Sequence, residues 1–546
     1  MKVSDDKIKD LLVKENYVSA EDMKKAEAFA SSHHSSITDY LFAEELIDKS
    51  TLGQAIAESF GLGFLNLDEE KPSKEQVLKL GEQSAVSNRV IFVGEKDKTC
   101  EFATDSPQNK ELIPKLKRAF KGKKIKLYYS FPESIDENLN YYKKSLETRF
   151  SQIVESKTRI APELVEEIVE DAISYHASDI HFEPQDDVVV IRFRIDGVLS
   201  EAGRIPNEYY ENILNRIKVM AQLRIDEHFA TQDGAIRLVV KGSEVDMRIS
   251  LAPTLDGEKI TIRLLAEYVR DLTLGELGLC DKDQAMLVEA AKRPFGMILV
   301  TGPTGSGKTT TLYALIKHLN DPTKNITTIE DPVEYKIPGT NQIQVNPEKD
   351  ITFAEGLRSI VRQDPDVILV GEIRDKETAE IAVNAALTGH LLFSTFHAND
   401  AATAIPRLMD MGVEPFLLSS TLNVIYSQRL VRKLCNACRY SEQISKIKVS
   451  QDYPGFSQYF SKETTIYRGK GCDICNGTGY KGRVGIFEYI KVTKEIQELM
   501  LNNPSTNEIW HLAKQQGAHT LAEDGVEKVK EGLTTLDELM RVIPAD

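Results

Sequence analysis

Met297-Ile-Leu-Val-Thr301 runs directly into Gly302-Pro-Thr-Gly-Ser-Gly307-Lys308-Thr309, a short apolar run followed by a glycine-rich turn. The turn fits the P-loop pattern G-x-x-x-x-G-K-[ST], in which backbone N–H groups and a helix N-terminus cradle phosphates. Lys308 would reach the β- and γ-phosphates, and the Thr309 hydroxyl would bind Mg²⁺. A chance match in a chain of this length has a probability of about 1–2%. The alternative is a strand–helix turn without nucleotide. The predicted nucleotide-binding residues are Gly302, Pro303, Thr304, Gly305, Ser306, Gly307, Lys308, Thr309 and Thr310.

The residues after Leu272 alternate between strand-like and helix-like patterns, which is typical of a parallel α/β sheet covered on both faces. A second apolar run, Val367–Val370, ends at Gly371-Glu372. A carboxylate delivered by a strand beside a P-loop is what a magnesium ion and an attacking water require. The sequence therefore places Glu372 as a candidate residue at the metal.

Two further clusters carry polar side chains suited to this chemistry. Ile329-Glu330-Asp331-Pro332-Val333-Glu334-Tyr335 contains three carboxylates, and His390 and His397 bracket an apolar run. Carboxylates can polarise water, and a histidine at a strand end can bond a phosphate. Each cluster taken singly is more often structural, so we treat Glu330, Glu334, His390 and His397 as candidates only.

Four of the six cysteines form two C-x-x-C pairs, Cys435 with Cys438 and Cys472 with Cys475. Four thiolates favour a closed tetrahedral Zn²⁺ site, which is structural because no ligand position stays open. A reduced, metal-free cluster or a redox pair is the alternative. Cys100 and Cys280 stand alone and are expected to be free thiols.

Composition limits the class of protein. The 546 residues are 41% hydrophobic and 28% charged, with a net charge of −16, and this length suits three or four soluble domains. So acidic a chain is a poor default binder of nucleic acid or anionic lipid. The first ten residues lack an apolar core, so we expect no signal peptide, and no apolar run approaches the ~18–20 residues of a transmembrane helix.

The region before the P-loop divides into three parts. Residues 1–66 show helical spacing, with Ser19 and Asp48 as candidate N-caps, and residues 71–142 have a mixed pattern. A charged stretch at 143–160 is a candidate linker. Residues 161–270 begin with a helix and continue as alternating strands.

The P-loop, ITTIEDPVEY, DPDVILVGEIRD and TGHLLFSTFHAND occur in the order of the Walker A, Asp box, Walker B and His box of the secretion ATPase superfamily. The resemblance extends from about Ala161 to the end of the chain through blocks such as ASDIHFEP, GEKITIRLL and GCDICNGTGYKGRVGIFEY. It implies an α/β, RecA-like ATPase core at 271–546, preceded by a mixed α+β, PAS-like domain at 161–270 and the family's N-terminal module at 1–142. The core would include the tetracysteine zinc subdomain at 431–490 and C-terminal helices at 491–546.

The resemblance also implies an activity and a setting. Members are ATP-hydrolysing homohexamers at the cytoplasmic face of the inner membrane, associated peripherally with an integral-membrane platform protein. They drive assembly of type IV pili or type II secretion pseudopili. The tetracysteine module and the long N-terminal region resemble the members that extrude filaments. The resemblance does not separate a pilus from a secretion system.

Two implications concern particular residues. The family places two arginines in the neighbouring subunit's nucleotide site, and these align with Arg248 in VDMRIS and Arg263 in ITIRLL. Strand alternation puts both on the face opposite the apolar residues. One departure is that DEHFATQDGAIR stands where relatives carry a more basic stretch.

Some relatives bind cyclic di-GMP through paired Arg-Leu-Gly repeats. At the matching positions this chain has Lys7-Ile8-Lys9 and Ser36-Ile37-Thr38. We therefore expect no tight cyclic di-GMP binding and favour docking to the membrane platform.

Two rival functions remain. A nucleic-acid translocase on the same core is disfavoured by the net charge and by the absence of a basic–aromatic stripe. A non-hydrolysing scaffold is disfavoured by the intact Lys308, Glu372 and arginine pair.

Overall fold

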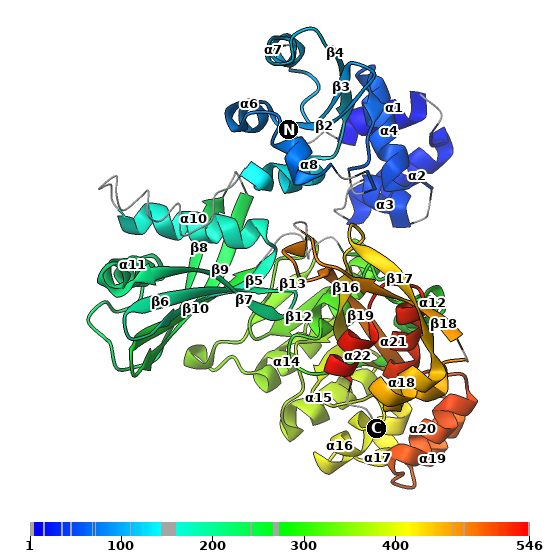
Figure 1. Ribbon diagram of the computed structural model, residues 1–546. Helices are drawn as coiled ribbons and strands as arrows, with labels where there is room; N and C mark the ends of the chain where they lie inside the picture. Colours follow the sequence, from blue (N-terminus) through cyan, green and yellow to red (C-terminus); the bar gives the residue numbers. More distant parts are fainter. Residues whose placement is uncertain are drawn as a thin grey trace. The chain divides into compact units, whose positions relative to one another are not determined.

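The computed structural model describes residues 5–14, 17–33, 37–43, 46–67, 69–70, 72–109, 111–142, 160–240, 243–265, 272–461, 463–472 and 475–543. The chain forms two compact units, Met1–Ala266 and Glu267–Asp546, each considered by itself (Figure 1). The predicted linker at 143–160 lies almost wholly outside the described residues, as does the predicted boundary at 270/271. No helix in the described ranges has the length and hydrophobicity needed to cross a bilayer.

The first 142 residues contain helices followed by a small mixed sheet, as their sequence pattern predicts. Ser19 accepts a hydrogen bond from the Asp22 amide at 3.1 Å, and Asp48 accepts one from the Thr51 amide at 2.6 Å, which confirms both N-caps. The sheet has strand order β1-β4-β3-β2. The elements are α1 (Asp5–Lys14), α2 (Ala20–His33), α3 (Ile37–Ala43), α4 (Lys49–Ser59), β1 (Gly63–Phe64), α5 (Lys74–Val77), α6 (Glu82–Asn88), β2 (Val90–Lys96), β3 (Thr99–Thr104), α7 (Leu112–Ala119), β4 (Lys124–Tyr129), α8 (Pro132–Leu139) and the 3₁₀ turn η1 (Asn140–Tyr142).

Residues 160–265 form a six-stranded antiparallel sheet, order β7-β6-β5-β10-β9-β8, with α10 and α11 packed together on its apolar face (Figure 1). Alternate residues of its strands, such as Ile260, Ile262 and Leu264, are buried in that core, which confirms the predicted two-residue alternation. The elements are α10 (Ile160–Ser174), β5 (Ala177–Pro184), β6 (Val188–Ile195), β7 (Val198–Pro206), α11 (Asn207–Met220), β8 (Gln232–Val240), β9 (Ser243–Thr254) and β10 (Gly257–Leu265).

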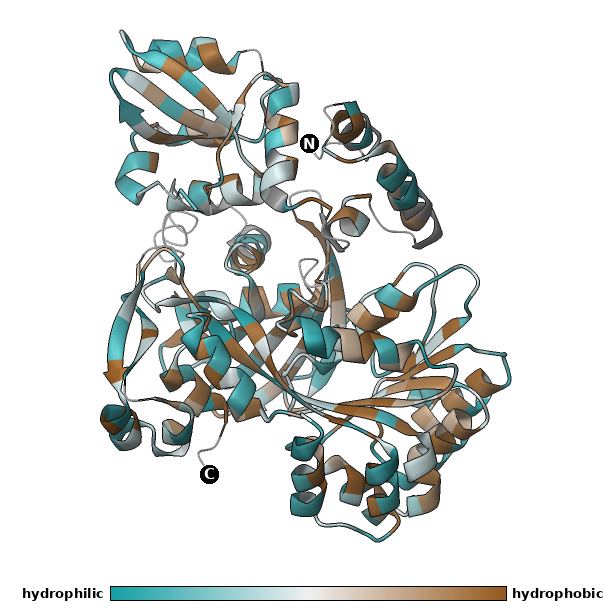
Figure 2. Ribbon diagram, turned by 90° about the vertical axis from the view of Figure 1, so that its right-hand side faces the viewer, coloured by the Kyte–Doolittle hydropathy of each residue, from teal (hydrophilic) through white to brown (hydrophobic). Residues whose placement is uncertain are grey.

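The second unit is built on a seven-stranded sheet of order β13-β12-β14-β15-β11-β16-β19, in which all neighbours are parallel except β16 and β19. Helices α12 and α13 pack on one face, and α14, α15 and α17 pack on the other. Figure 2 shows hydrophobic residues concentrated along these strands and on the inward helix faces. The elements are α12 (Asp281–Ala291), β11 (Gly296–Thr301), α13 (Lys308–Leu319), β12 (Ile326–Glu330), β13 (Asn341–Gln344), η3 (Pro347–Lys349), α14 (Phe353–Val361), β14 (Val367–Val370), α15 (Lys376–Leu387), β15 (Leu391–Phe396), α16 (Ala404–Asp410), α17 (Pro415–Thr421), β16 (Leu422–Leu434) and β19 (Tyr480–Lys491).

A smaller subdomain and four helices complete this unit. The antiparallel pair β17 and β18 joins α18 and η4 around an apolar core shared with α21 and α22. Its elements are β17 (Arg439–Ser445), α18 (Lys446–Asp452), η4 (Pro454–Tyr459) and β18 (Glu463–Gly469), followed after β19 by α19 (Lys494–Met500), α20 (Thr506–Gln515), α21 (Leu521–Lys530) and α22 (Leu536–Val542). The molecule therefore has the predicted α/β core with a mixed domain and a helical module before it.

Candidate functional site

The glycine-rich turn joins the fully buried strand β11 to helix α13, as its sequence predicts. Gly302, Gly305 and Gly307 all have positive φ, at 140°, 78° and 86°. A Cβ on Gly302 would lie 2.5 Å from the Gln428 carbonyl oxygen, so only glycine fits there. The turn needs these glycines for both its conformation and its close packing.

Lys308 is buried at the start of α13, and its Nζ donates to the carbonyl oxygens of Gly302 and Pro303 at 2.9 and 3.0 Å. Burial lowers the pKa of Lys308, and the negative charge of Glu372 opposes that shift. A phosphate group would favour the charged ammonium in the same way, because an opposite charge nearby stabilises it. Thr309 and Thr310 follow on the first turn and are half-buried.

Gln428 on β16 holds the glycine-rich turn in place through two hydrogen bonds, a role that the sequence did not predict. Its Nε2 donates to the Ser306 carbonyl oxygen at 2.6 Å, and its Oε1 accepts from the Thr311 hydroxyl at 2.8 Å. Gln428 is 2% exposed. The only signal in the sequence is that Gln428 directly follows the mostly apolar run at 422–427, where a polar side chain is typical of one with internal partners.

Glu372 follows β14 at the end of the sheet where the P-loop lies, because the carboxyl ends of parallel strands share one edge. Its side chain, 15% exposed, accepts from Arg374 Nη2 at 2.5 Å and lies 3.2 Å from His397 Nε2. Burial raises the pKa of Glu372, but Arg374 and His397 more than offset that effect, and the pKa falls below its ordinary value. Glu372 is therefore held as a carboxylate.

Arg374 contributes a second contact that sequence reasoning missed. Its Nη1 lies 3.8 Å from Asp331 Oδ2, so one guanidinium connects the segments after β12 and β14. The sequence signal was an arginine two residues after the strand-end Glu372, within reach of that carboxylate. Strand order explains the link, since β12 and β14 are adjacent.

The two candidate bases of the Asp box have different surroundings. Glu330 is 2% exposed and accepts hydrogen bonds from the hydroxyls of Tyr313 and Thr328 and from the Gln342 amide. Burial raises the pKa of Glu330. Glu334 is half-exposed and lies four residues further along the loop. Glu330 is thus almost fully buried, whereas Glu334 is partly exposed to solvent.

The two histidines lie at opposite ends of β15. His397 follows the strand and reaches Glu372, whereas His390 precedes it and lies 2.9 Å through Nδ1 from the Ala385 carbonyl oxygen. The six-residue strand between them spans about 20 Å. The structure therefore does not bring His390 to the P-loop edge, contrary to the expected shared role.

Arg248 and Arg263 belong to the first unit. They are direct cross-strand partners on β9 and β10, on the face opposite the apolar core, as alternation predicted. Arg263 is 59% exposed and donates from Nε to Asp179 Oδ1 at 3.1 Å.

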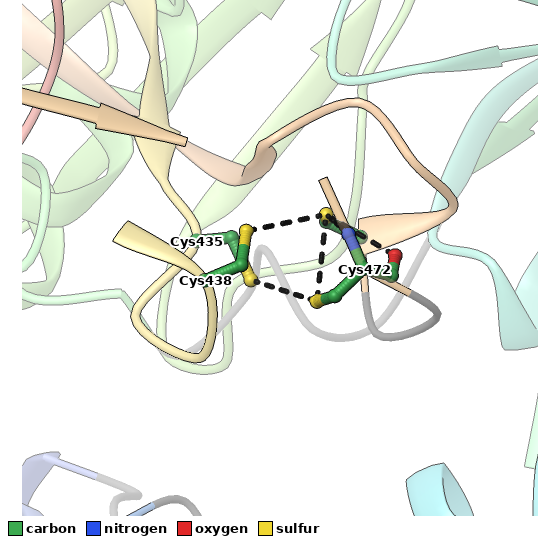
Figure 3. Close-up of side chains that lie close together, drawn as sticks. Cys435, Cys438 and Cys472 are labelled. Atoms are coloured by element: carbon green, nitrogen blue, oxygen red, sulfur yellow. Dashed lines mark hydrogen bonds between the residues drawn. The ribbon is translucent and has the colours of Figure 1, made fainter. Parts of the chain in front are cut away.

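The four cysteines of the C-x-x-C pairs converge between β16 and β19 (Figure 3). Their sulfur atoms lie within 4.8 Å of one another, with three separations of 3.7–3.8 Å. A tetrahedral zinc with Zn–S bonds of about 2.3 Å requires S···S edges of about 3.8 Å. Cys475 Sγ also accepts hydrogen bonds from the amides of Cys472 and Gly479 at 3.2 Å, which suits a thiolate. The residues present fit a closed Zn²⁺ site.

Comparisons with known proteins identify the family of the chain. The family model for type II/IV secretion system proteins matches residues 154–541, and the MshEN domain model matches residues 60–149. The chain is 47% identical to type II secretion system protein E of Pseudomonas aeruginosa over 69% of its own length and 74% of that protein. It is 37% identical to the type IV pilus assembly ATPase PilB of Myxococcus xanthus, over 97% of this chain and 98% of the relative. The type IV pilus assembly ATPase PilB of Thermus thermophilus is 38% identical to this chain. That match covers 92% of this chain and 58% of the relative.

Among solved structures, the Legionella pneumophila ATPase DotB superposes with a TM-score of 0.53 at 21% identity, over 70% of this chain and 96% of that one. This likeness supports the fold. Together with the P-loop geometry, the family match and the full-length similarity show that the chain is an ATPase belonging to the family of type II/IV secretion system proteins.

Proposed function

We propose that this chain is a homohexameric ATP-hydrolysing motor that powers assembly of a type IV pilus or a type II secretion pseudopilus. It works at the cytoplasmic face of the inner membrane, docked peripherally on an integral-membrane platform protein. The domains are the N-terminal module at 1–142, the linker at 143–160, the PAS-like domain at 161–270 and the ATPase domain at 271–546, with the zinc subdomain at 431–490. The names of the relatives support this role.

One observation carries the proposal: Lys308, Glu372 and His397 come from segments that follow adjacent parallel strands at one sheet edge. Lys308 and Thr309 would hold the phosphates and Mg²⁺ of ATP, and the magnesium would neutralise charge on the transferred phosphoryl group. Glu372 would orient the metal's ligand shell as a carboxylate. His397 contacts Glu372 and would respond to the γ-phosphate, whereas His390 lies at the opposite end of β15 and would not share that role.

Glu334 is our candidate for activating water, because it is half-exposed, whereas Glu330 is only 2% exposed. A general base must reach the proton that it removes, and a half-exposed carboxylate after the strand end meets that need. Tyr313 contacts both segments of the Asp box: its hydroxyl donates to Glu330 and accepts from the Glu334 amide at 3.3 Å. Glu330 and Tyr313 would therefore support the loop that presents Glu334.

Arg248 and Arg263 would complete the site of a neighbouring subunit. An arginine that reaches a transferring phosphoryl group from outside is worth about 10³–10⁵ in rate. In a closed ring with head-to-tail interfaces, each site then uses residues of two chains. Hydrolysis would thereby be tied to movement between subunits, as a motor requires.

Turnover by purified full-length protein tests this site. Lys308→Ala should abolish Mg²⁺-dependent ATP hydrolysis, because it removes the cation that contacts the phosphates. Glu372→Gln should bind ATP and stall turnover, because it removes charge at the metal and leaves the phosphate cradle intact. Hydrolysis by Lys308→Ala at the wild-type rate would refute the assignment.

A further inference from the structure

Asp179 occupies the centre of a row of charged residues in the six-stranded sheet. It lies on β5, in register with Arg194 on β6 and with Arg263 on β10. Arg263 is in turn directly opposite Arg248 on β9. The row therefore crosses four adjacent strands on the face away from the apolar core, with three positive charges and one negative charge.

Asp179 contacts the guanidinium of Arg263 only at its Nε atom. Asp179 Oδ1 accepts from Arg263 Nε at 3.1 Å, and Oδ2 lies 3.5 Å from Arg194 Nε. The Ser178 hydroxyl donates to the same Oδ2 at 2.8 Å, and the Asp179 side chain is 8% exposed. Within the part of the chain that the structure describes, Arg263 makes no other hydrogen bond or ion pair, so its two terminal Nη groups stay available.

The bond from Arg263 to Asp179 offsets the repulsion between the two neighbouring arginines of the row. Like charges directly opposite each other on a sheet repel, so Arg248 and Arg263 would turn apart without an opposing charge. A flexible arginine also has many rotamers, and its planar fork binds phosphate best when two of its N–H groups point the same way. An acceptor at Nε restricts the rotamers and leaves the fork pointing outward.

We propose that Asp179 is the positioning residue for Arg263, holding its guanidinium in the orientation in which it engages the phosphates of the neighbouring subunit's ATP. The proposal rests on the role given to Arg263 above. In this proposal Asp179 acts on hydrolysis through Arg263, whose Nε it accepts from, and not on the substrate itself.

The same sheet supplies a matched control. Glu183 lies four residues further along β5, on the same face and with a side chain 14% exposed. Its carboxylate also bridges two cations, Arg192 on β6 and Lys259 Nζ on β10, the latter at 2.8 Å. Glu183→Gln therefore removes an equivalent charge from an equivalent ion cluster without touching Arg263.

The experiment compares ATP hydrolysis by full-length Asp179→Asn and Glu183→Gln. Misplacing a catalytic group by about 1 Å can cost about 100-fold in rate, so Asp179→Asn should lower kcat about 10- to 100-fold. Its KM for ATP should stay within about twofold of wild type, because the P-loop is untouched. Glu183→Gln should keep kcat within about twofold. Asp179→Glu, which retains the charge, should recover part of the lost kcat and gives a readout if Asp179→Asn folds poorly.

A double variant identifies the route of the effect. Adding Asp179→Asn to Arg263→Ala should cause no further loss beyond that of Arg263→Ala alone, because two residues that act as a unit are not additive. A further 10-fold loss, or an equal fall in kcat with Glu183→Gln, would overturn the proposal. Wild-type kcat in Asp179→Asn with an inactive Arg263→Ala would overturn it while leaving the proposed function intact. Full activity in Arg263→Ala would refute the role of Arg263 itself.

Discussion

Purified protein prepared without chelator should contain one zinc ion per chain, and Cys472→Ser should release it. The three sulfur separations of 3.7–3.8 Å match the edges of a tetrahedral Zn²⁺ site, so little rearrangement is needed for binding. Losing the ion also opens the loop between Cys438 and Cys472. The entropy of closing a loop of about 35 residues is worth about 4 kcal/mol, and structural zinc sites contribute about 10–16 kcal/mol in isolated peptides.

The expected damage is local. The apolar core of the zinc subdomain is separate from the two cores that flank the ATPase sheet, although it shares residues of β16 and β19 with that sheet. Hydrogen exchange in Cys472→Ser should therefore rise sharply over residues 435–480 and stay near wild type over β11 and α13. Cys280→Ser is the control, because Cys280 is an exposed free thiol away from the cluster in sequence.

Metal analysis by mass spectrometry, paired with hydrogen exchange, checks both statements. Zinc well below one equivalent in the wild-type protein would refute the assignment. Full zinc content with unchanged exchange in Cys472→Ser would do so as well.

The remaining predictions concern catalysis and the N-terminal module. Glu334→Gln should lower kcat at least 100-fold and leave the unfolding temperature unchanged. Glu330→Gln should lower the unfolding temperature, because it alters a buried hydrogen-bond cluster. If turnover and melting show the opposite pattern, the two roles are reversed. Calorimetry should detect no cyclic di-GMP binding at micromolar concentrations, and binding that disappears on deletion of residues 1–142 would contradict the expectation drawn from Lys7-Ile8-Lys9.

Local patterns predicted the elements that hold the site. The apolar run before the P-loop and the helical pattern after it correspond to β11 and α13, and strand alternation placed Arg248 and Arg263 away from the core. These features depend only on residues that are neighbours in the sequence, so local patterns are enough to predict them.

Non-local packing accounts for what the sequence did not predict. Gln428 lies more than 100 residues from the turn that it contacts, and the Tyr313 hydroxyl that engages Glu330 comes from helix α13, whereas Glu330 ends strand β12. Register between β5 and β10, which brings Asp179 to Arg263, also has no local signature. His390 is different: in a parallel sheet only residues after a strand reach the P-loop edge, and His390 precedes β15.

The central claim is that two neighbouring subunits build each catalytic site of a ring-shaped motor. Mixing Lys308→Ala subunits with Arg263→Ala subunits tests it, because some interfaces then pair an intact P-loop with an intact arginine. With equal amounts and random order, about a quarter of the interfaces, half times half, should be whole. ATPase activity of mixed hexamers, verified by native mass spectrometry, should rise above that of either mutant alone. Verified mixed rings as inactive as the pure mutants would contradict the shared site.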